Sequence, residues 1–341
     1  RWRVFGFGWL GDLGDARGLL EDARHGVPRL GEGYTTDDNA RALLYLSLLP
    51  EGARDEGLVR TYLAFLLHMQ KEDGRFRNGL TLDGRFEDEG EAEDPTGRAV
   101  LALAAAQRLP PPYAGPAREA LLRALPALEG FTSLRGRAYA LLGLLALPKE
   151  PFLEAAEALG EGLLRAFREA EPAWPYPGPL TYANHRPVEA LYAYGLAFRR
   201  QEAVALARRA LAFLKEHYFT PGEEGLFFDP VGNRFMARGR DKPLFDQQPI
   251  EAKCALLAHL RFGERVLAEV AFLWFHGRNR LRAPLVDAFG PMDGLTPHGP
   301  NQNRGAEALL AYLLAWQALV QGVFPQVDEG GALGRSFALG G

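Results

Sequence analysis

One short pattern occurs six times along this chain of 341 residues, each time at the start of a strongly apolar segment. Each copy is a polar cluster, a charged residue and then a run rich in Ala and Leu. The charged position is occupied in turn by Arg41, Arg98, Arg137, Glu189, Glu251 and Glu307, in steps of 57, 39, 52, 62 and 56 residues. Two helices with their connections need about that length. Self-similarity at such a period indicates a repeat architecture, in which each unit buries its apolar face against its neighbours.

The segments after the six charged positions predict one set of helices, and the segments between them predict a second set. Pro95, Pro187 and Pro249 stand where a first helical residue belongs, because the N–H missing there has no helical partner. The first set is apolar on nearly all sides and should form an inner layer; it includes Ala40–Leu49, Arg98–Leu109 and Ala306–Val320. The second set carries arginines on one face and should lie outside: Leu58–Gln70, Pro116–Leu128, Glu150–Ala170, Gln201–Tyr218 and Glu264–Phe275. A short helix near Asp12–Arg24 would complete the outer set.

These segments predict an all-α fold, an (α/α)6 toroid of six helical hairpins that forms a single domain over residues 1–341. Single cores usually stop growing near 250–300 residues, but repeated hairpins extend one core around an axis. The inner-to-outer connections are short and the outer-to-inner connections are mostly long. The pocket should therefore lie among the long loops, at the N-terminal ends of the inner helices. Small β-hairpins are expected in these loops, at Asp83-Gly84 and over Gly225–Met236.

Composition excludes several classes of function. The net charge of -4 gives no reason to expect nucleic acid or an anionic membrane as a partner, and no apolar run approaches the ~20 residues that span a bilayer. Residues 1–30 carry no signal-peptide pattern, so the expected compartment is the cytoplasm. The seven histidines are scattered without metal-ligand spacing. No glycine motif for phosphate or a dinucleotide is found, so we expect neither a metal nor another cofactor.

Carboxylates gather at the predicted starts of the inner helices. Glycoside hydrolysis needs two of them about 5–9.5 Å apart, one as a proton donor and the other as a base or nucleophile. A ring of helix starts offers such separations. The candidate catalytic residues are Asp37, Asp38, Asp94 and Glu251.

Each of these carboxylates also has a possible structural role. Asp37 and Asp94 are good helix N-caps, and a Glu at the third helical position, such as Glu251, is typical of a capping box. The repeat offers a further role, since buried charges need partners. Three Arg followed by three Glu at one position predicts ion pairs across the lumen, between the set Arg41, Arg98, Arg137 and the set Glu189, Glu251, Glu307.

Aromatic and amide side chains in the same loops indicate a sugar ligand. Aromatic faces can stack on the C–H faces of a pyranose, and amides can hold hydroxyl groups; the mixture is poor for phosphate. The candidate substrate-binding residues are Arg41, Arg98, Trp174, Tyr176, Asn184, His185, Gln247, Gln248, Asn301, Gln302 and Asn303.

Three segments carry a resemblance to a known family: Gly33–Ala42, Asp246–Ala252 and Asn301–Glu307. Over roughly residues 30–320 the chain resembles the six-hairpin glycosidase-like superfamily, and more narrowly a bacterial toroid domain often fused to a glycosyltransferase. The resemblance implies a carbohydrate ligand and a glycosyltransferase as a possible partner. One motif departs from the family pattern Thr-Tyr-Asp-Asn-Ala-Arg, because Ala183 stands at the Asp position. The loss of a carboxylate there predicts a different substrate, or binding without cleavage.

The leading hypothesis is a glycoside hydrolase acting on an oligosaccharide or another glycoside. Asp37 or Asp38 would work with Asp94 or Glu251, and Trp174 and Tyr176 would line a sugar subsite. A sugar epimerase or isomerase on the same ring would instead need a base such as His185 or His298. A non-catalytic sugar-binding module that serves a partner enzyme is the third hypothesis. A terpene-cyclase-like toroid is disfavoured, because the loops are too polar for a hydrocarbon cavity.

Overall fold

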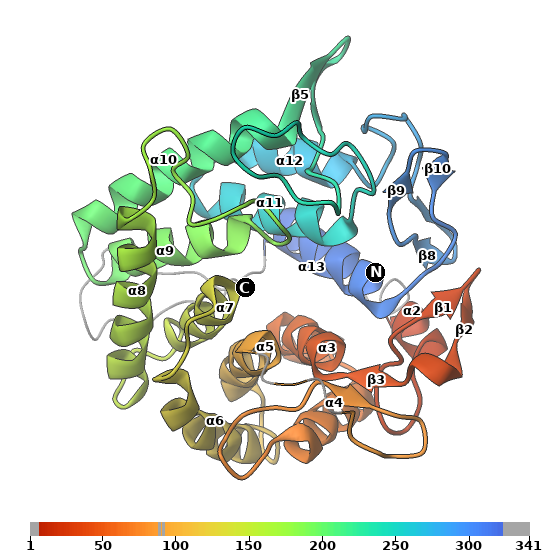
Figure 1. Ribbon diagram of the computed structural model, residues 1–341. Coiled ribbons are helices and arrows are strands. Elements are labelled where there is room, and N and C mark those ends of the chain that lie inside the picture. The colour runs from red at the N-terminus through yellow and green to blue at the C-terminus, as the bar shows by residue number, and fades with distance from the viewer. Residues whose placement is uncertain (1–6, 88–89, 91–92, 323–341) are drawn as a thin grey trace.

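A computed structural model describes residues 7–87, 90 and 93–322 of the chain. The domain predicted over residues 1–341 also includes residues 1–6, 88–89, 91–92 and 323–341, which lie outside the described residues. The described helices form two concentric layers (Figure 1).

Six helices form the inner layer, and each packs against the next around a closed ring. They are α3 (Thr36–Leu48), α5 (Glu93–Ala105), α7 (Leu134–Leu144), α9 (His185–Ala197), α11 (Pro249–Arg261) and α13 (Ala306–Gln321). The ring closes where α13 packs against α3, at the junction of blue and red in Figure 1. Small residues allow the close approaches: a β-carbon on Gly143 of α7 would lie 2.7 Å from the Cα of Leu101 in α5.

The outer layer contains α4 (Glu56–Met69), α6 (Ala114–Leu128), α8 (Phe152–Arg168), α10 (Gln201–Tyr218) and α12 (Arg265–Leu273). Each of them packs against the inner helix that precedes it in the chain. The predicted order of inner and outer helices is therefore confirmed. No described helix has the length and apolar character that a membrane crossing requires.

The expected helix near Asp12–Arg24 is wrong. The N-terminal helix is α2 (Phe7–Asp12), and bends and bridges follow it. The Asp15 carboxylate accepts hydrogen bonds from the backbone N–H groups of Arg17, at 2.8 Å, and Gly18, at 3.3 Å. Such local side-chain bonds compete with a helix for the same backbone donors.

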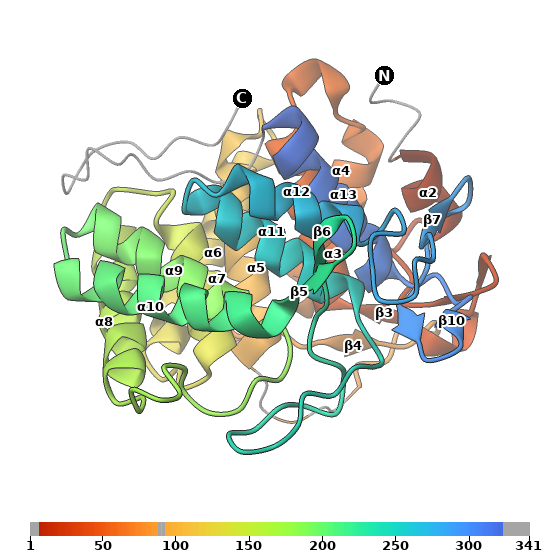
Figure 2. The ribbon, with the colours of Figure 1, turned by 90° about the horizontal axis from the view of Figure 1, so that it is seen from above.

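Five two-stranded antiparallel sheets complete the described elements. They pair β1 (Ala23–Arg24) with β2 (Val27–Pro28), β3 (Tyr34–Thr35) with β4 (Gly79–Leu80), β5 (Phe219–Gly222) with β6 (Gly225–Phe228), β7 (Val286–Asp287) with β8 (Gly290–Pro291), and β9 (Leu295–Thr296) with β10 (Gly299–Pro300). Single-turn 3-10 helices cover Leu30–Glu32, Glu51–Ala53 and Ala106–Arg108. The long loops gather at one side of the helical layers, at the lower side in Figure 2.

One expected hairpin is confirmed and the other is displaced. The turn at Asp83-Gly84 brings Leu80 and Phe86 into an antiparallel bridge. The hairpin expected over Gly225–Met236 ends at Phe228, because its first strand is the preceding β5. The chain from Asp229 onward instead forms a long loop that reaches the candidate site.

Candidate active site

Two cavities open at the N-terminal ends of the inner helices, and both border Asp37, Asn233, Gln248 and Glu307. The larger, of about 440 Å³, we call the acidic chamber. Eight carboxylates line it: Glu21, Asp22, Glu32, Asp37, Asp38, Asp246, Asp293 and Glu307. The second, of about 390 Å³, we call the aromatic chamber, because Tyr182 and Phe235 line it beside Asp94 and Arg98.

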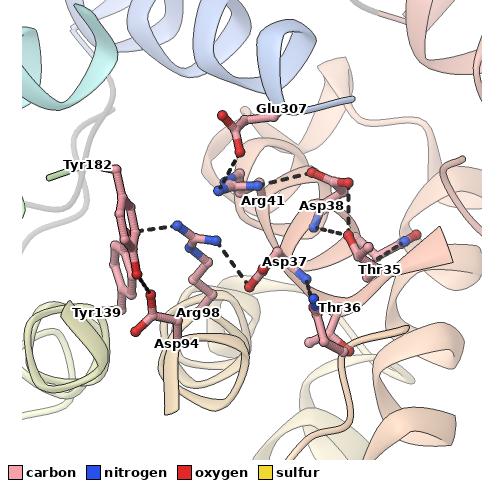
Figure 3. A network of polar contacts seen from close by, with 12 residues as sticks. Thr35, Thr36, Asp37, Asp38, Arg41, Asp94, Arg98, Tyr139, Tyr182 and Glu307 are labelled. Carbon is pink, nitrogen blue, oxygen red and sulfur yellow. Dashed lines mark hydrogen bonds and ion pairs between the residues drawn. The ribbon is translucent and has the colours of Figure 1, made fainter. Parts of the chain in front are cut away.

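The start of α3 places two adjacent carboxylates in different electrostatic surroundings (Figure 3). Thr35, and not Asp37, caps this helix: its hydroxyl oxygen accepts the backbone N–H of Asp38 at 3.2 Å. Asp37 is thus not needed as a cap, and it lines both chambers. Its carboxylate forms an ion pair with Arg98 at 3.1 Å. The Arg98 guanidinium also donates to the Tyr139 hydroxyl at 2.9 Å, which fixes its direction.

Asp38 is 4% exposed and still lines the acidic chamber. It accepts hydrogen bonds from Arg41 at 3.0 Å and from the Thr35 hydroxyl at 2.8 Å. Burial raises the pKa of Asp38 to about 6, against the opposing effects of Arg41 and Thr35. A carboxyl group with this pKa exchanges its proton near neutral pH.

Arg41 links Asp38 to the opposite wall of the acidic chamber. Its guanidinium lies 3.7 Å from Glu307, so the predicted pairing of Arg41 with a Glu of the repeat is confirmed for this residue. The Glu307 side chain is 49% exposed and borders both chambers. It therefore faces the cavity as well as its cationic partner.

Asp94 lines the aromatic chamber and does not lie at an N-cap position, because α5 begins one residue earlier at Glu93. Its carboxylate accepts hydrogen bonds from the Tyr182 hydroxyl and, at 3.1 Å, from Ser133. Arg135 lies over the Tyr182 ring, with its guanidinium carbon 4.6 Å from the ring centroid. Asp94 and Tyr182 thus form a fixed polar pair in the chamber wall.

Glu251 lies behind the chamber walls and lines neither chamber. It is 1% exposed, and one carboxyl oxygen accepts the backbone N–H of Ala183 at 2.9 Å. No capping box forms, because the Glu251 carboxyl group binds the Ala183 N–H in the loop before α9 and not a backbone N–H of its own helix. Burial raises the pKa of Glu251 to about 8, so the group is neutral at pH 7.

The other predicted pairs across the lumen are wrong. Arg98 pairs with Asp37 and not with a Glu of the repeat. Glu189 lies between Arg186 and Arg261, at 2.9 Å from each, among leucines deeper in the ring. Arg137 donates to the carbonyls of Phe131 and Gly162 and faces the outer layer.

Trp174 and Tyr176 lie outside both chambers. They border a separate surface groove beside Gly178 and Arg238. The Trp174 indole N–H donates to the carbonyl of Gly178 at 2.8 Å. Tyr176 is 1% exposed, and its hydroxyl donates to the carbonyl of Asn184 at 2.8 Å. Both aromatics therefore stabilise their own loop at a distance from Asp37 and Asp38.

The remaining predicted binding residues divide by location. Gln248 borders both chambers, and Asn301 and Gln247 line the acidic chamber, although the Gln247 side chain is buried against Asp229 and Trp274. Asn184 and His185 are fully buried behind the chambers, with Asn184 bonded to Arg135 and Tyr218. Gln302 and Asn303 line neither chamber.

Several lining residues were not among the predicted site residues. Asp293 lines the acidic chamber, and burial raises its pKa to about 6. Asn233 and Phe235 reach the site from the long loop after Asp229. Their signal in the sequence was only their place in a long outer-to-inner connection, which does not distinguish one loop residue from another.

The lining of the two chambers contains Asp, Glu, Arg, amide and hydroxyl side chains but, among the described residues, no histidine. His185 is buried beside Tyr218 and His259, and burial holds its pKa well below the ordinary value. His298 is exposed and lies outside both linings. Within the described part of the chain, no group of three or more His, Cys, Asp or Glu is arranged to hold a metal ion.

The chain matches no protein-family model, and no curated protein matches its sequence. Solved structures do match its fold. A sugar epimerase from a ruminal bacterium has a TM-score of 0.69 at 11% identity, over 95% of this chain and 98% of that one. A cellobiose 2-epimerase from Spirochaeta thermophila has a TM-score of 0.62 at 16% identity, over 92% of both chains. A family 76 α-mannanase from Bacteroides thetaiotaomicron has a TM-score of 0.61 at 11% identity, over 94% of this chain and 95% of that one. The predicted (α/α)6 toroid is thereby confirmed as the fold.

Proposed function

We propose that the toroid this chain shares with those sugar-converting enzymes carries a glycoside hydrolase site, with Asp37 and Asp38 as its catalytic carboxylates. The observation that supports this most directly is the pairing of two unlike carboxyl groups at the start of α3. Asp37 forms an ion pair with Arg98 at 3.1 Å, while burial raises the pKa of Asp38 to about 6. In glycosidases, one carboxyl group acts as the acid and another as the base or nucleophile because their surroundings shift their pKa values apart.

In this mechanism Asp38 supplies the proton and Asp37 supplies the negative charge. The Asp38 proton passes to the glycosidic oxygen as the bond from that oxygen to the anomeric carbon breaks. The electron pair of that bond leaves with the oxygen. Positive charge develops on the anomeric carbon and is met by the Asp37 carboxylate, which acts as the nucleophile or as the base that activates water.

The other wall residues suit the binding of hydroxyl groups. Glu307, Asn233 and Gln248 border both chambers and offer acceptors and donors around Asp37. Asp94 and Tyr182 add a second polar pair in the aromatic chamber. Carboxylate and amide side chains in a concave site fix the orientation of a polar ligand.

The epimerase hypothesis needs a base in reach of the sugar, and neither His185 nor His298 lines a chamber. The epimerase hypothesis therefore loses the two bases named for it, while the carboxylates that hydrolysis needs line the acidic chamber. A sugar-binding module without turnover, which would serve a partner enzyme such as a glycosyltransferase, is another outcome of the test.

The test is product analysis with a panel of α- and β-linked di- and trisaccharides of mannose and glucose. We expect new reducing ends from at least one of them, and loss of this activity in Asp37→Asn and Asp38→Asn. The exposed Asp241→Asn is the matched control and should keep full activity. Conversion of a disaccharide to an isomer without release of monosaccharides would show an epimerase, and binding without conversion would show a module. Proton NMR of the first product formed distinguishes retention from inversion at the anomeric carbon.

A further inference from the structure

Phe235 is an exposed aromatic residue at the edge of the candidate site. Its side chain is 52% exposed and lines the aromatic chamber. Its φ of +63° lies in the left-handed region, which bulky residues other than Gly, Asn and Asp seldom adopt. A strained backbone that presents an apolar ring to solvent is a feature of binding sites more than of stable surfaces.

Hydrogen bonds on both sides of Phe235 hold its backbone in place. Met236 and Leu180 exchange two backbone hydrogen bonds of 2.8 Å each. Two residues before Phe235, the Asn233 backbone N–H donates to the carbonyl of Asp246 at 3.1 Å, and the Asn233 side chain accepts from the Asp246 N–H at 3.3 Å. A platform fixed before the ligand arrives loses little conformational entropy on binding.

The loop that carries Phe235 is also anchored at its base. Asp229 is fully buried, and its carboxylate accepts hydrogen bonds from Arg280 at 2.7 Å, Thr220 at 2.7 Å and Gln247 at 2.8 Å. These donors come from β5, from the end of the same loop and from the loop after α12. The position of Phe235 relative to the ring is therefore defined by several elements.

The two chambers share part of their lining at the proposed catalytic residue Asp37. Asp37 and Glu307 border both, and each chamber falls within the volume range of small-ligand sites. The acidic chamber is walled by carboxylates and amides. The aromatic chamber has Tyr182 and Phe235 in its wall, and an aromatic face suits the apolar side of a sugar ring.

We propose that Phe235 is the stacking platform for a second sugar ring, so that the substrate is a di- or oligosaccharide with one ring in each chamber and the scissile bond at Asp37. This inference rests on the proposed function and deepens it by naming the substrate class. It also predicts that Phe235 determines the preference for oligosaccharides over glycosides with one sugar ring.

Phe289 provides a matched control. It is 77% exposed, belongs to a neighbouring loop and lines neither chamber. Its removal eliminates an exposed aromatic ring of the same size without changing the wall of either chamber.

The experiment is calorimetric titration of the wild-type protein, Phe235→Ala, Phe235→Trp and Phe289→Ala. The probes are mannobiose, cellobiose and maltose, with methyl α-mannoside and methyl β-glucoside as single-ring ligands. We expect Phe235→Ala to weaken disaccharide binding about tenfold, the size of one aromatic contact. Binding of the methyl glycosides should stay unchanged. Phe235→Trp should restore disaccharide affinity, and Phe289→Ala should match the wild type.

Three results would overturn the inference. Equal disaccharide affinity in wild type and Phe235→Ala would show that no ring stacks there, while the proposed function would stand. An equal loss for single-ring and two-ring ligands, or no rescue by Trp, would show that Phe235 only supports the loop. If the wild type binds and cleaves none of these sugars, the proposed function fails together with the inference.

Discussion

The carboxyl group of Glu251 and the backbone N–H of Ala183 form a buried hydrogen bond of 2.9 Å that joins α11 to the loop before α9. Ala183 has a left-handed φ of +47° and is fully buried. The residue next to it, Tyr182, donates to Asp94 in the aromatic chamber. Glu251 therefore supports the site from behind and does not touch its cavity, which makes it a positioning residue.

Glu251→Gln should fold and turn over substrate like the wild type at pH 6, because an amide oxygen can accept the same N–H and is neutral like the protonated acid. Glu251→Ala leaves the Ala183 N–H buried without a partner, which costs about 1–3 kcal/mol of unfolding free energy. We expect it also to raise KM, because Tyr182 is displaced. Chemical denaturation and steady-state kinetics measure the two effects. If Glu251→Gln folds normally but loses turnover, the residue is catalytic after all.

The same residue predicts a dependence of stability on pH. The pKa of Glu251 is raised by burial from 4.5 to about 8, so the folded state binds more protons than the unfolded state between these values. Its contribution to stability is thus fully present below pH 4.5 and is lost as the pH rises toward 8. Compared with Glu251→Gln, the wild type should lose unfolding free energy across that window. A difference between the two proteins that stays constant from pH 5 to pH 8 would show that Glu251 is ionised throughout.

Asp38→Asn should separate catalysis from folding. Burial disfavours the charged form of Asp38, and the amide oxygen of Asn can still accept hydrogen bonds from Thr35 and Arg41. Glu307, 3.7 Å from Arg41, stays as an anionic partner of that guanidinium. We expect an unchanged or higher Tm and a loss of turnover of about 10²–10⁴-fold, the range for a proton-transfer group. The alkaline limb of the kcat/KM profile should lie near pH 6 in the wild type. If Asp38→Asn is as active as the wild type, Asp38 is not catalytic and its role is to bind Arg41 and Thr35.

Glu307→Gln should affect turnover more than stability. The Glu307 carboxylate is half exposed and 3.7 Å from Arg41, whereas Asp38 contacts the same guanidinium at 3.0 Å. Arg41 keeps one anionic partner after the substitution, so we expect a loss of at most about 1 kcal/mol of unfolding free energy. Thermal melts and kinetics on the same preparations measure both. A loss of several kcal/mol would indicate that Arg41 depends on Glu307 for its neutralisation.

Asp229→Ala should loosen the loop that forms one wall of both chambers. It leaves the partly exposed Arg280 and Lys242 without their shared carboxylate. The loss of unfolding free energy should lie between the ~1 kcal/mol of a surface pair and the about 3–5 kcal/mol of a fully buried one. We expect a lower Tm and faster proteolysis within residues 229–248. Asp241→Ala, an exposed change in the same loop, is the control and should behave like the wild type. Equal melting curves for the two variants would contradict the anchoring role.

The ring was predictable from sequence because its signals are local and repeated. Apolar segments recur at all six inner helices, and α10 matches the predicted Gln201–Tyr218 while α13 begins at the predicted Ala306. Prolines mark three of the inner starts: Pro249 is the first residue of α11 as predicted, whereas Pro95 and Pro187 are the third residues of α5 and α9. The end of the ring that bears the site followed from loop lengths. Both features can be read from the sequence without knowing which side chains contact one another.

The pairing of side chains could not be predicted in the same way. Arg41 is the sixth residue of α3, whereas Arg137 is the fourth of α7, and at 3.6 residues per turn this offset turns Arg137 away from the lumen. Glu251 and Asp38 show the same limit. Both are carboxylates near a helix start, yet one lies behind the wall and the other lines the cavity. Only the packing of loops from distant parts of the chain decides between them.

The contact of α13 with α3 joins the first and last inner helices, and Gln317 donates to the carbonyl of Tyr45 across 272 positions of sequence. Arg41 and Glu307 lie at this same junction. The acidic chamber therefore lacks the part of its wall that contains Glu307 until α13 has been synthesised. During synthesis the earlier hairpins can pack against one another while the chamber is still open on one side. The sugar binding proposed for that chamber is for this reason a property that the chain would acquire late, when the two ends of the ring meet.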